Sequence, residues 1–471
     1  MNGATNQGRC LGMLARVVVL ALASGCSTYQ QQNQALGYYR HGDLAEAEKA
    51  ATKSATKHRN GKDHIIWYLE LGAIQRAAGK YADSNRTFEI AEERIRQYDE
   101  EAKTKLGSET GAFLTTQANL PYRGRAYDKI MLSTYKALNY LQLGDLEKAR
   151  IELNSAYAFQ QDAVEENKRT IEKTQEAVAN DKHRAQIKKA RENAAVNDRL
   201  SASYAEMDEM KVYADYVNPF TVYLDGLYRL AAGVDASDFE RARKSLERAG
   251  SYAEDNKFVK MDLQSAEDVI AGKSLEPTTY VIFETGEAPE RDQIRIDIPI
   301  FVGPVTYVGA AFPVLKFHPR EIASLQVGGA GTNETTQLLC SIDSVISSDF
   351  KNERPAIIAK TIASTVTKAV ASAVAKQAAG GSDSTAGLFV GLITLVAQAA
   401  VNIADLRTWT TLPKEYQVCR VSTPTDRKIE LQAVGGRQKQ EVTVQEGMIN
   451  VIFVKCINTT TPLWVSQLKL K

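Results

Sequence analysis

A short pattern that recurs four times constrains the first half of this chain more than any other feature. Each copy has a Gly or Ser at a turn, then a large apolar residue, and then a small residue. Two helices joined by a tight turn need these residue types. Gly relaxes the turn, the large side chain fills the space between the helices, and the small one lets them approach closely. The copies are Gly42-Asp43-Leu44 with Ala47, Gly79-Lys80-Tyr81 with Ser84, Gly144-Asp145-Leu146 with Ala149, and Ser237-Asp238-Phe239 with Ala242.

The pattern resembles the tetratricopeptide repeat, a helix–turn–helix unit of about 34 residues. The second copy extends the match to Leu71-Gly72 before the turn and to Phe88 and Ala91 after it. The third copy has Ala137, Tyr140, Leu153 and Ala156 at the same offsets. We therefore expect structural roles at the turns and helix contacts for Gly79, Tyr81, Gly144, Leu146 and Ala149.

The turns are unevenly spaced, so helical insertions must separate the later copies. The largest insertion, about residues 158–215, is rich in Lys, Glu, Asp, Arg and Ala, with sparse apolar residues such as Val178 and Ile187. No Pro or Gly interrupts it before Pro219. This composition indicates long exposed helices, for which an antiparallel pair is the natural arrangement. A solvated hairpin and an arm that binds a partner are the two readings.

Near residue 275 the periodicity changes from helix to strand. Ile294, Ile296 and Ile298 alternate with charged residues, which is the signature of a half-buried strand. We therefore expect an α+β multidomain fold, with a helical domain over 26–274 and an antiparallel β-sandwich-like domain over 275–471. Further strands are expected at Tyr280–Phe283, Val305–Val308, Ile322–Val327, Gln337–Ile342, Tyr416–Val421, Lys428–Val434, Glu441–Val444, Ile449–Ile457 and Leu463–Leu470.

A segment of about 355–406 interrupts this β region and predicts an Ala/Gly-rich helical hairpin. Its first half, from Pro355, carries periodic Ile and Val, Gly380-Gly381 makes a turn, and Ala386 to Ala404 is nearly uniformly apolar. The apolar half would span roughly 28 Å as a helix, about the thickness of a bilayer core. The hairpin either packs on the rest of the chain or contacts a membrane or sister subunits. Gln398 and Asn402, which would be costly in lipid, favour the first reading.

Residues 1–25 have the features of a secretory signal. Arg9 and Arg16 precede a short apolar run, and small residues follow it. The run is shorter than the roughly 20 apolar residues that a membrane span needs. Cys26 follows directly on Ala-Ser-Gly, which resembles the lipobox of bacterial lipoproteins, although Ala23 stands where Leu is usual.

The lipobox resemblance implies cleavage before Cys26 and lipidation of its thiol, and several acyl chains would make that anchor durable. Asp after the cysteine would resemble an inner-membrane retention signal, so Ser27 favours the outer membrane, facing the periplasm. The alternative is an ordinary signal peptide with an incidental cysteine. After export, Cys340, Cys419 and Cys456 would permit one disulfide, and buried free thiols are an equal alternative because all three lie in apolar runs.

The charge balance and the missing motifs exclude several classes of function. Lys and Arg total 58 against 57 Asp and Glu, so the chain lacks the basic excess that nucleic-acid binding requires. The five histidines are scattered, and there is no Gly-x-Ser-x-Gly elbow and no phosphate loop. No carboxylate pair stands in an apolar setting that would separate its pKa values. We therefore expect no catalytic residues, no metal and no cofactor.

Two surfaces are candidates for binding. Aromatic and cationic side chains interleave before the third repeat, and such a group could hold an anionic glycan or a peptide carboxylate. The alternative is a loop that packs on the repeat. The inner groove of the repeats is the second surface. The first candidate comprises Tyr122, Arg123, Arg125 and Tyr127, and the second comprises Ile66, Leu69, Ala73, Arg76, Met131, Thr134, Leu138 and Leu141.

Several longer motifs are spread along the chain: Asn119-Leu120-Pro121-Tyr122-Arg123-Gly124, Tyr135-Lys136-Ala137-Leu138-Asn139-Tyr140-Leu141, Gly144-Asp145-Leu146-Glu147-Lys148-Ala149-Arg150, Asn218-Pro219-Phe220, Ala404-Asp405-Leu406-Arg407-Thr408-Trp409 and Thr411-Leu412-Pro413. Through these residues the chain resembles a widespread family of uncharacterised bacterial envelope lipoproteins with tetratricopeptide-like helices. The likeness extends from about Gln30 to Val434 and implies fold and location but no activity.

These features predict a non-enzymatic, lipid-anchored scaffold or adaptor that binds other envelope proteins through its repeats, since superhelical repeats present binding surfaces. A second hypothesis is an outer-membrane assembly or secretion component whose 355–406 hairpin oligomerises or contacts the membrane. A third, a hydrolase of cell wall or glycan, depends on location alone, because function resides in sites and not in folds.

Overall fold

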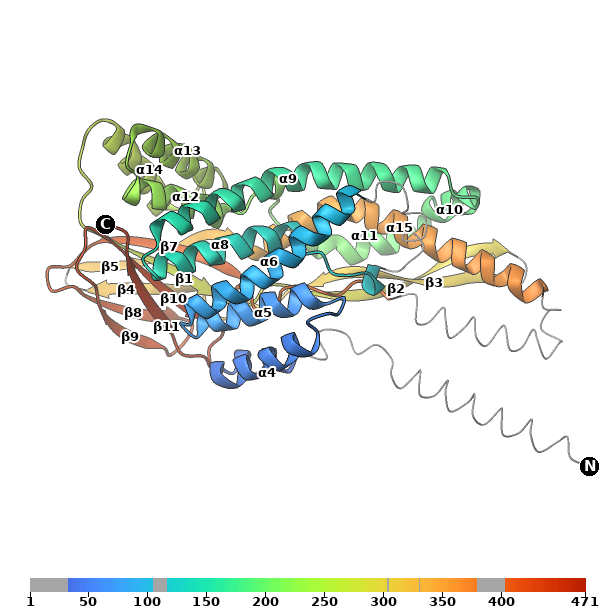
Figure 1. Ribbon diagram of the computed structural model, residues 1–471, viewed down its shortest axis with the longest axis horizontal. Coiled ribbons are helices and arrows are strands. Elements are labelled where there is room, and N and C mark those ends of the chain that lie inside the picture. The colour runs from blue at the N-terminus through green and yellow to red at the C-terminus, as the bar shows by residue number, and fades with distance from the viewer. Residues whose placement is uncertain (1–32, 105–116, 303–304, 330, 379–402) are drawn as a thin grey trace, which may run out of the picture.

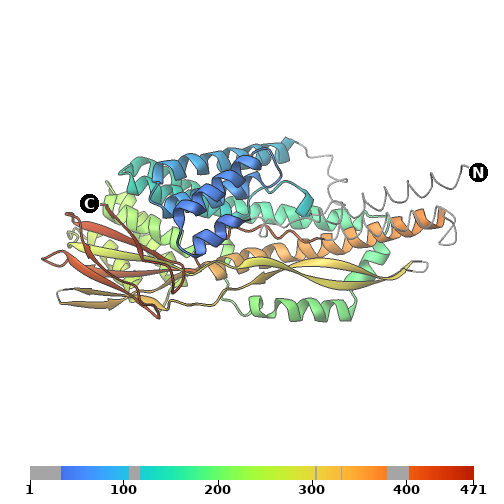
Figure 2. The ribbon, with the colours of Figure 1, turned by 90° about the horizontal axis from the view of Figure 1, so that it is seen from below.

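The computed structural model describes residues 33–104, 117–302, 305–329, 331–378 and 403–471. The described chain is elongated, with β-sheets at one end and a long arm of helices and two strands at the other (Figures 1 and 2). Its class is α+β, with the helices mainly in the N-terminal part and the sheets after residue 277. Residues 1–32, which contain the expected signal and Cys26, lie outside the described ranges.

Paired antiparallel helices build the N-terminal part. Neighbours along the chain pack against each other, notably α5 with α6, α8 with α9, and α12 with α13. The helices are α3 (Gln34–Arg40), α4 (Leu44–Lys57), α5 (His64–Ala77), α6 (Tyr81–Thr104), η1 (Gln117–Asn119), α8 (Ala126–Gln142), α9 (Leu146–Ala179), α12 (Pro219–Ala232), α13 (Ala236–Tyr252) and α14 (Lys257–Ile270).

The predicted turns at Gly42, Gly79 and Gly144 are confirmed, whereas Ser237 of the fourth copy lies inside α13, which begins at Ala236. Gly79 and Gly144 adopt φ of 75° and 76°, a left-handed conformation that costs Gly little. Tyr81 and Leu146 begin the helices that follow. Ala149 is fully buried. In the second copy, a Cβ on Gly72 would lie 2.4 Å from the Phe88 ring, so only Gly allows α5 and α6 to approach this closely.

The predicted insertion is helical, but several of its apolar residues are buried and not exposed to solvent. It contains the distal half of α9, then α10 (Arg184–Arg191), α11 (Ala194–Asp208) and η2 (Ala214–Tyr216). Side chains including Ile187 and Leu200 are buried in a core that they share with β2, β3 and α15. The sparse apolar stripe therefore attaches the insertion to another part of the molecule.

Every predicted strand is present, but the pairing differs from an antiparallel sandwich. Strand β1 pairs with β7 antiparallel and with β10 in parallel, from Thr278↔Ile449 to Thr285↔Cys456. The sheets have the orders β11-β10-β1-β7-β6, β2-β3 and β5-β4-β8-β9. The strands are β1 (Thr278–Thr285), β2 (Glu290–Val302), β3 (Val305–Lys316), β4 (Ser324–Gly329), β5 (Thr332–Thr335), β6 (Gln337–Ser341), β7 (Glu415–Ser422), β8 (Lys428–Val434), β9 (Lys439–Thr443), β10 (Ile449–Cys456) and β11 (Trp464–Lys469).

Strands β2 and β3 leave the sheets and form a separate two-stranded ribbon. The predicted alternation holds, because Ile296 and Ile298 of β2 are buried together with Phe312 of β3. Helices α11 and α15 pack against this ribbon (Figure 2). We call α10, α11, α15, β2 and β3, with the distal half of α9, the arm.

Helix α15 (Ile342–Ala378) corrects the predicted bounds of the hairpin. It begins well before Pro355, which lies inside the helix. Residues 379–402, including most of the apolar second half, lie outside the described ranges, and residues 403–406 are not helical. By length and composition alone, Ile342–Val374 could cross a membrane, but half of its most apolar stretch is buried within the protein, as in the core helix of many water-soluble folds.

One hydrophobic core unites the helical part with both larger sheets. It runs from Ala35 in α3 to Leu470 after β11. Phe220 of α12 stacks on Tyr416 of β7 with ring centroids 3.7 Å apart. We call the elements that share this core the body. The change from helix to strand falls between Ile270 and Thr278, close to the expected position.

Candidate functional site

The expected inner groove of the repeats is not an open surface. Ile66, Leu69, Met131, Thr134 and Leu138 are buried, so the prediction that they line an accessible groove is wrong. Arg76 is also covered, because its guanidinium pairs with Glu284 of β1 at 3.1 Å while Lys455 of β10 approaches the same carboxylate at 3.0 Å. The repeats therefore use this face to hold the rest of the chain.

An extended stretch of the chain, Ala404–Leu412, covers much of this face, and we call it the covering segment. Trp409 is fully buried and meets Phe88 and Tyr135 edge-on, with ring centroids 5.8 and 5.6 Å away. The Tyr127 hydroxyl lies 3.0 Å from that of Thr408. Aromatic packing at this depth supplies much of the contact energy at such a junction.

Glu70 fixes the backbone of the covering segment. Its carboxylate is buried in the middle of α5 and accepts the backbone N–H groups of Thr410 at 2.8 Å and Thr411 at 3.1 Å. A buried carboxylate is costly unless it is hydrogen-bonded, and these bonds offset that cost. Sequence reasoning missed Glu70. The available signal was a single acidic residue inside an apolar helix, since such a residue requires a partner.

Arg407 fixes the other end of the covering segment. Its guanidinium donates to Asp63 at 3.0 Å, to the Leu120 carbonyl at 2.9 Å and to Asp405 at 2.7 and 3.0 Å. Burial raises the pKa of Asp405, but Arg407, with Arg125 and Arg291, outweighs it and holds that pKa well below the usual range. The covering segment is thus bound through hydrogen bonds, ion pairs and one large aromatic side chain.

The aromatic and cationic group before the third repeat is mostly interior, which corrects the expectation of an exposed cluster. Tyr122 and Tyr127 are buried and only 9% of the Arg125 side chain is exposed, whereas Arg123 remains on the surface. Tyr122 donates its hydroxyl to Asp128, and its ring lies beneath the Arg407 guanidinium. These side chains organise the start of α8 and the covering segment, so they are not free to hold a glycan.

Arg125 also belongs to a buried group of charges where α8, β2 and α15 meet. We call Arg125, Asp128, Arg291, Asp349 and Glu353 the junction cluster. Arg125 pairs with Glu353 at 2.9 Å, and Arg291 approaches the same carboxylate at 3.5 Å. Burial raises the pKa of Asp128 to about 6 despite its bonds from Arg125 and Tyr122.

Asp349 is the least satisfied member of the junction cluster. It is buried, and neither carboxylate oxygen has a hydrogen-bond partner among the described residues. Burial, with the nearby charge of Glu353, raises the pKa of Asp349 well above its usual range. The junction cluster is closed to solvent on most sides, so it joins the arm to the body and does not form an open catalytic site.

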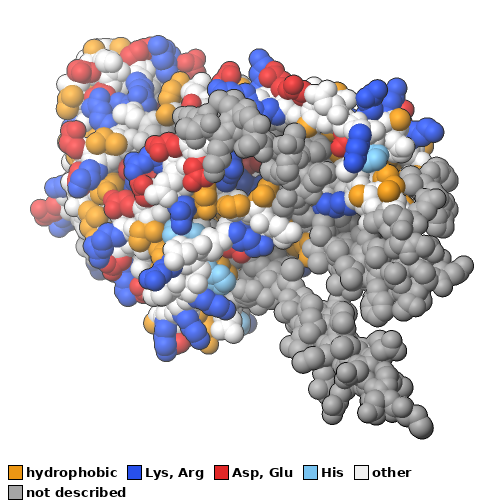
Figure 3. Space-filling view, turned by 45° about the vertical axis from the view of Figure 1, so that its right-hand side comes forward, with side chains coloured by type: hydrophobic (Ala, Val, Ile, Leu, Met, Phe, Trp, Pro, Cys, Tyr) orange, Lys and Arg blue, Asp and Glu red, His pale blue; other side chains and the backbone are white. Residues whose placement is uncertain are grey.

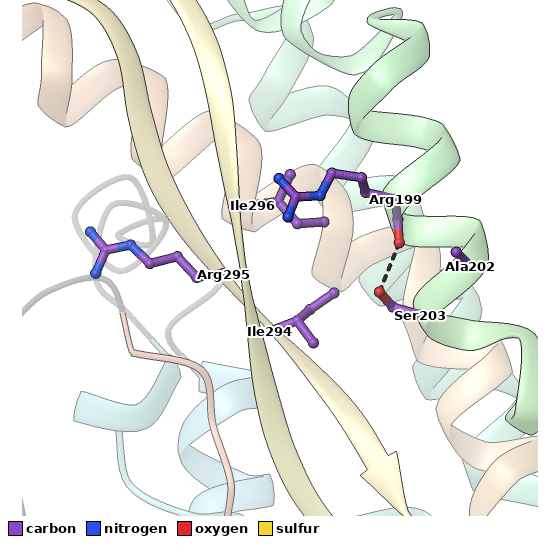
Figure 4. Close-up of a pocket in the computed structure, with 6 residues that line it drawn as sticks. All are labelled: Arg199, Ala202, Ser203, Ile294, Arg295 and Ile296. Atoms are coloured by element: carbon purple, nitrogen blue, oxygen red, sulfur yellow. Dashed lines mark hydrogen bonds between the residues drawn. The ribbon is translucent and has the colours of Figure 1, made fainter.

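An open groove of about 350 Å³ lies between α11 and β2 (Figure 4). Arg199, Ala202 and Ser203 line it from α11, and Ile294 and Ile296 from β2. The Ser203 hydroxyl donates to the Arg199 carbonyl at 2.7 Å, and Arg295 points to the opposite side of β2 (Figure 4). The residues that line this groove offer no nucleophile paired with a base.

The cysteines follow one of the two expected alternatives. Cys340, Cys419 and Cys456 are free and buried. Burial raises the pKa of Cys340 and of Cys419 to about 12, which keeps both as unreactive thiols. Within the described ranges, no group of three His, Cys, Asp or Glu side chains is arranged to hold a metal ion.

Comparison with known proteins adds little to this description. No known family model and no curated protein sequence matches the chain. A tetratricopeptide repeat protein from Parabacteroides merdae, solved by crystallography, is similar at 15% identity over 50% of this chain and 96% of that protein. The TM-score of 0.13 is too low for this likeness to carry any conclusion about function.

Proposed function

We propose that this chain is a lipid-anchored scaffold of the bacterial cell envelope, without enzymatic activity of its own. The signal-like residues 1–25, followed by Cys26 and Ser27, support anchoring at the outer membrane and a position facing the periplasm. The resemblance to envelope lipoproteins supports the same location. The helix pairs are tetratricopeptide-like in their turns, with Gly42, Gly79 and Gly144 all at positive φ.

The observation that carries the scaffold proposal is the way the helical pairs hold an extended peptide. Glu70 binds two successive backbone amides of the covering segment, and Asp63 binds Arg407. This face is satisfied from within the chain, so partner envelope proteins would bind the opposite, exposed side of the repeats. Ile151 and Tyr157 of α9 offer apolar side chains there, at 59% and 49% exposure.

Site-specific photo-crosslinking in living cells tests this proposal. A photoreactive amino acid at Ile151 or Tyr157 should give discrete adducts with envelope proteins, whereas the same residue at buried Met131 should give none. Adducts from Met131 would mean that the covering segment dissociates from the repeats and that their inner face binds the partners. Absence of adducts from several exposed positions would overturn the scaffold function.

The lipid anchor is tested separately. Cells that express the wild type or the Cys26→Ala variant are fed a clickable fatty acid. We expect label on the wild type alone, together with release of the variant from membranes or its accumulation in unprocessed form. Equal label on both proteins would contradict anchoring at Cys26 and would leave the crosslinking result untouched.

An assembly component is the second candidate function, because α15 is apolar enough to cross a membrane over Ile342–Val374. The chain from residue 27 onward, purified without detergent, distinguishes the two functions. A monodisperse monomer favours the scaffold, and large rings or detergent-dependent oligomers favour assembly. Removing 355–406 is unsuitable as a control, because α15 packs in the arm and Asp405 binds Arg407. A deletion limited to residues 379–402 avoids both.

A further inference from the structure

Helix α10 and the residues just before it concentrate positive charge on a molecule whose net charge is close to zero. The stretch 182–191 carries five cations and no carboxylate, whereas the whole chain has a formal charge of +1. All five cations are exposed. Figure 3 shows Lys and Arg side chains gathered, with few carboxylates, towards the end of the molecule that carries α10. The cations are Lys182, Arg184, Lys188, Lys189 and Arg191.

The fold holds these cations in place and points them outward. Ile187 and Ala190 form the apolar side of α10, and both are buried in the core of the arm. The polar side must therefore face solvent. Lys188 has one loose ion pair, with Glu192 at 3.9 Å, and both of those side chains are exposed. The other four cations have no ion-pair partner in the described part of the chain.

Two exposed apolar side chains lie towards the same end of the arm. Tyr307, near the start of β3, is 62% exposed, and Val374, near the end of α15, is 59% exposed. The start of β3, the end of α15 and α10 all lie at the end of the molecule opposite the sheets (Figures 1 and 2). An aromatic side chain beside basic residues is typical of a surface that meets lipid headgroups.

We propose that the end of the arm docks on an anionic phospholipid bilayer through the cations of α10, with Tyr307 and Val374 at the headgroup level. Charge complementarity favours an anionic bilayer as the binding partner of this surface, because clustered Lys and Arg on one side of an amphipathic helix are attracted to anionic lipid. This surface is separate from the exposed side of α9 that we propose for protein partners.

Vesicle co-sedimentation tests the proposal with the chain from residue 27 onward, which lacks Cys26 and includes every described element. This protein should bind vesicles in which a third of the lipid is phosphatidylglycerol, and should not bind phosphatidylcholine alone. Binding should fall steeply as salt approaches ~1 M, where the Debye length is about 3 Å. Because no lipid anchor is present, the result is independent of the proposed modification at Cys26.

A charge-matched pair of variants makes the test specific. Lys188→Glu/Lys189→Glu/Arg191→Glu should weaken binding to the anionic vesicles on the order of 100-fold or more. Lys244→Glu/Lys260→Glu/Lys273→Glu, on α13, on α14 and just after α14, changes the net charge equally and should cost a few-fold at most. All six side chains are exposed, so both variants should unfold at the wild-type temperature. Equal losses in the two variants, undiminished binding by the first, or equal binding to neutral vesicles would each overturn the proposal.

Discussion

The body and the arm are built in different ways, and the difference predicts which of them unfolds locally at the lower free energy. The body draws its core from segments as distant as Ala35 and Leu470, and it holds large rings such as Trp409 beside buried ion pairs such as Arg76–Glu284. The arm has a thinner core, mostly aliphatic and Ala side chains from three stretches of the chain. A region with fewer buried contacts opens at a lower free energy than the rest of a molecule.

This comparison also explains why the inner face of the repeats is not open to binding partners. In a simple repeat array the inner face stays open and binds a partner. Here the strands and the covering segment occupy it, so burial of the inner face of the repeats contributes to the stability of the body. The surfaces left for partners are the outer side of the repeats and the arm. The predictions below test the packing of the body, the packing of the arm and the junction between them.

The largest effect is expected at the centre of the body. Trp409→Ala removes a fully buried ring that Phe88 and Tyr135 contact, and it should lower the free energy of unfolding by about 3–5 kcal/mol. Chemical denaturation followed by circular dichroism measures the change. Leu143→Ala, at a half-exposed side chain, is the control and should stay within about 0.5 kcal/mol. A loss at Trp409 no greater than the control's would mean that the covering segment does not bind the repeats.

The second prediction concerns the arm alone. Ile362→Ala removes a buried side chain from α15 and should destabilise the arm by about 2–4 kcal/mol. Hydrogen exchange should then accelerate in α15, β2 and β3 and remain unchanged in β1 and β10. Val374→Ala, at an exposed position of the same helix, should change neither region. Equal acceleration in β1 and β10 would show that arm and body unfold as one unit and would remove the distinction between them.

The third prediction returns to the helix contacts of the repeats. Ala149 is fully buried where α8 packs on α9, so Ala149→Leu should overpack this contact at a cost of about 1–3 kcal/mol. Ala158→Leu makes the same change on an exposed face of α9 and should leave the unfolding midpoint unaltered. Similar midpoints for the two variants would contradict the register assigned to the third repeat.

The features that could be predicted from sequence are those that neighbouring residues determine. The turn at Gly144 depends on one residue's conformational freedom, and the strand at Ile294–Ile298 depends on alternation over a few positions. The parallel pairing of β1 with β10 joins residues 278–285 to 449–456, and no local pattern reports a partner that far away. The same limit explains why an all-antiparallel sandwich was expected.

The candidate site was harder to predict, because buried and exposed polar residues look alike in a sequence. Tyr122, Arg125 and Tyr127 read as a surface cluster only while their partners are unknown. The partners of Arg125 and Tyr127 are Glu353, Asp405 and Thr408, and Arg407 covers the Tyr122 ring, all more than two hundred residues downstream. A buried Arg needs acceptors, and a chain with many carboxylates offers no means to choose among them without the fold.

The smallest effect is expected where the arm joins the body, at Asp349. Its folded-state pKa lies above that of an ordinary Asp, because burial and Glu353 disfavour the charge more than Arg125 and Arg291 favour it. Folding therefore takes up a proton at intermediate pH, and stability falls as pH rises from the ordinary Asp range through the folded-state pKa. Asp349→Asn removes this penalty and should stabilise the protein by about 1 kcal/mol at alkaline pH, the lower end of what an unsatisfied buried polar group costs. The gain should shrink as pH falls through the ordinary Asp pKa of about 3.9, below which the wild-type carboxyl is protonated in both states. Thermal unfolding across this pH range measures the trend, with exposed Asp198→Asn as the control. A gain that does not depend on pH would mean that the Asp349 carboxyl has the same pKa in the folded and unfolded states, so that the junction cluster tolerates its charge.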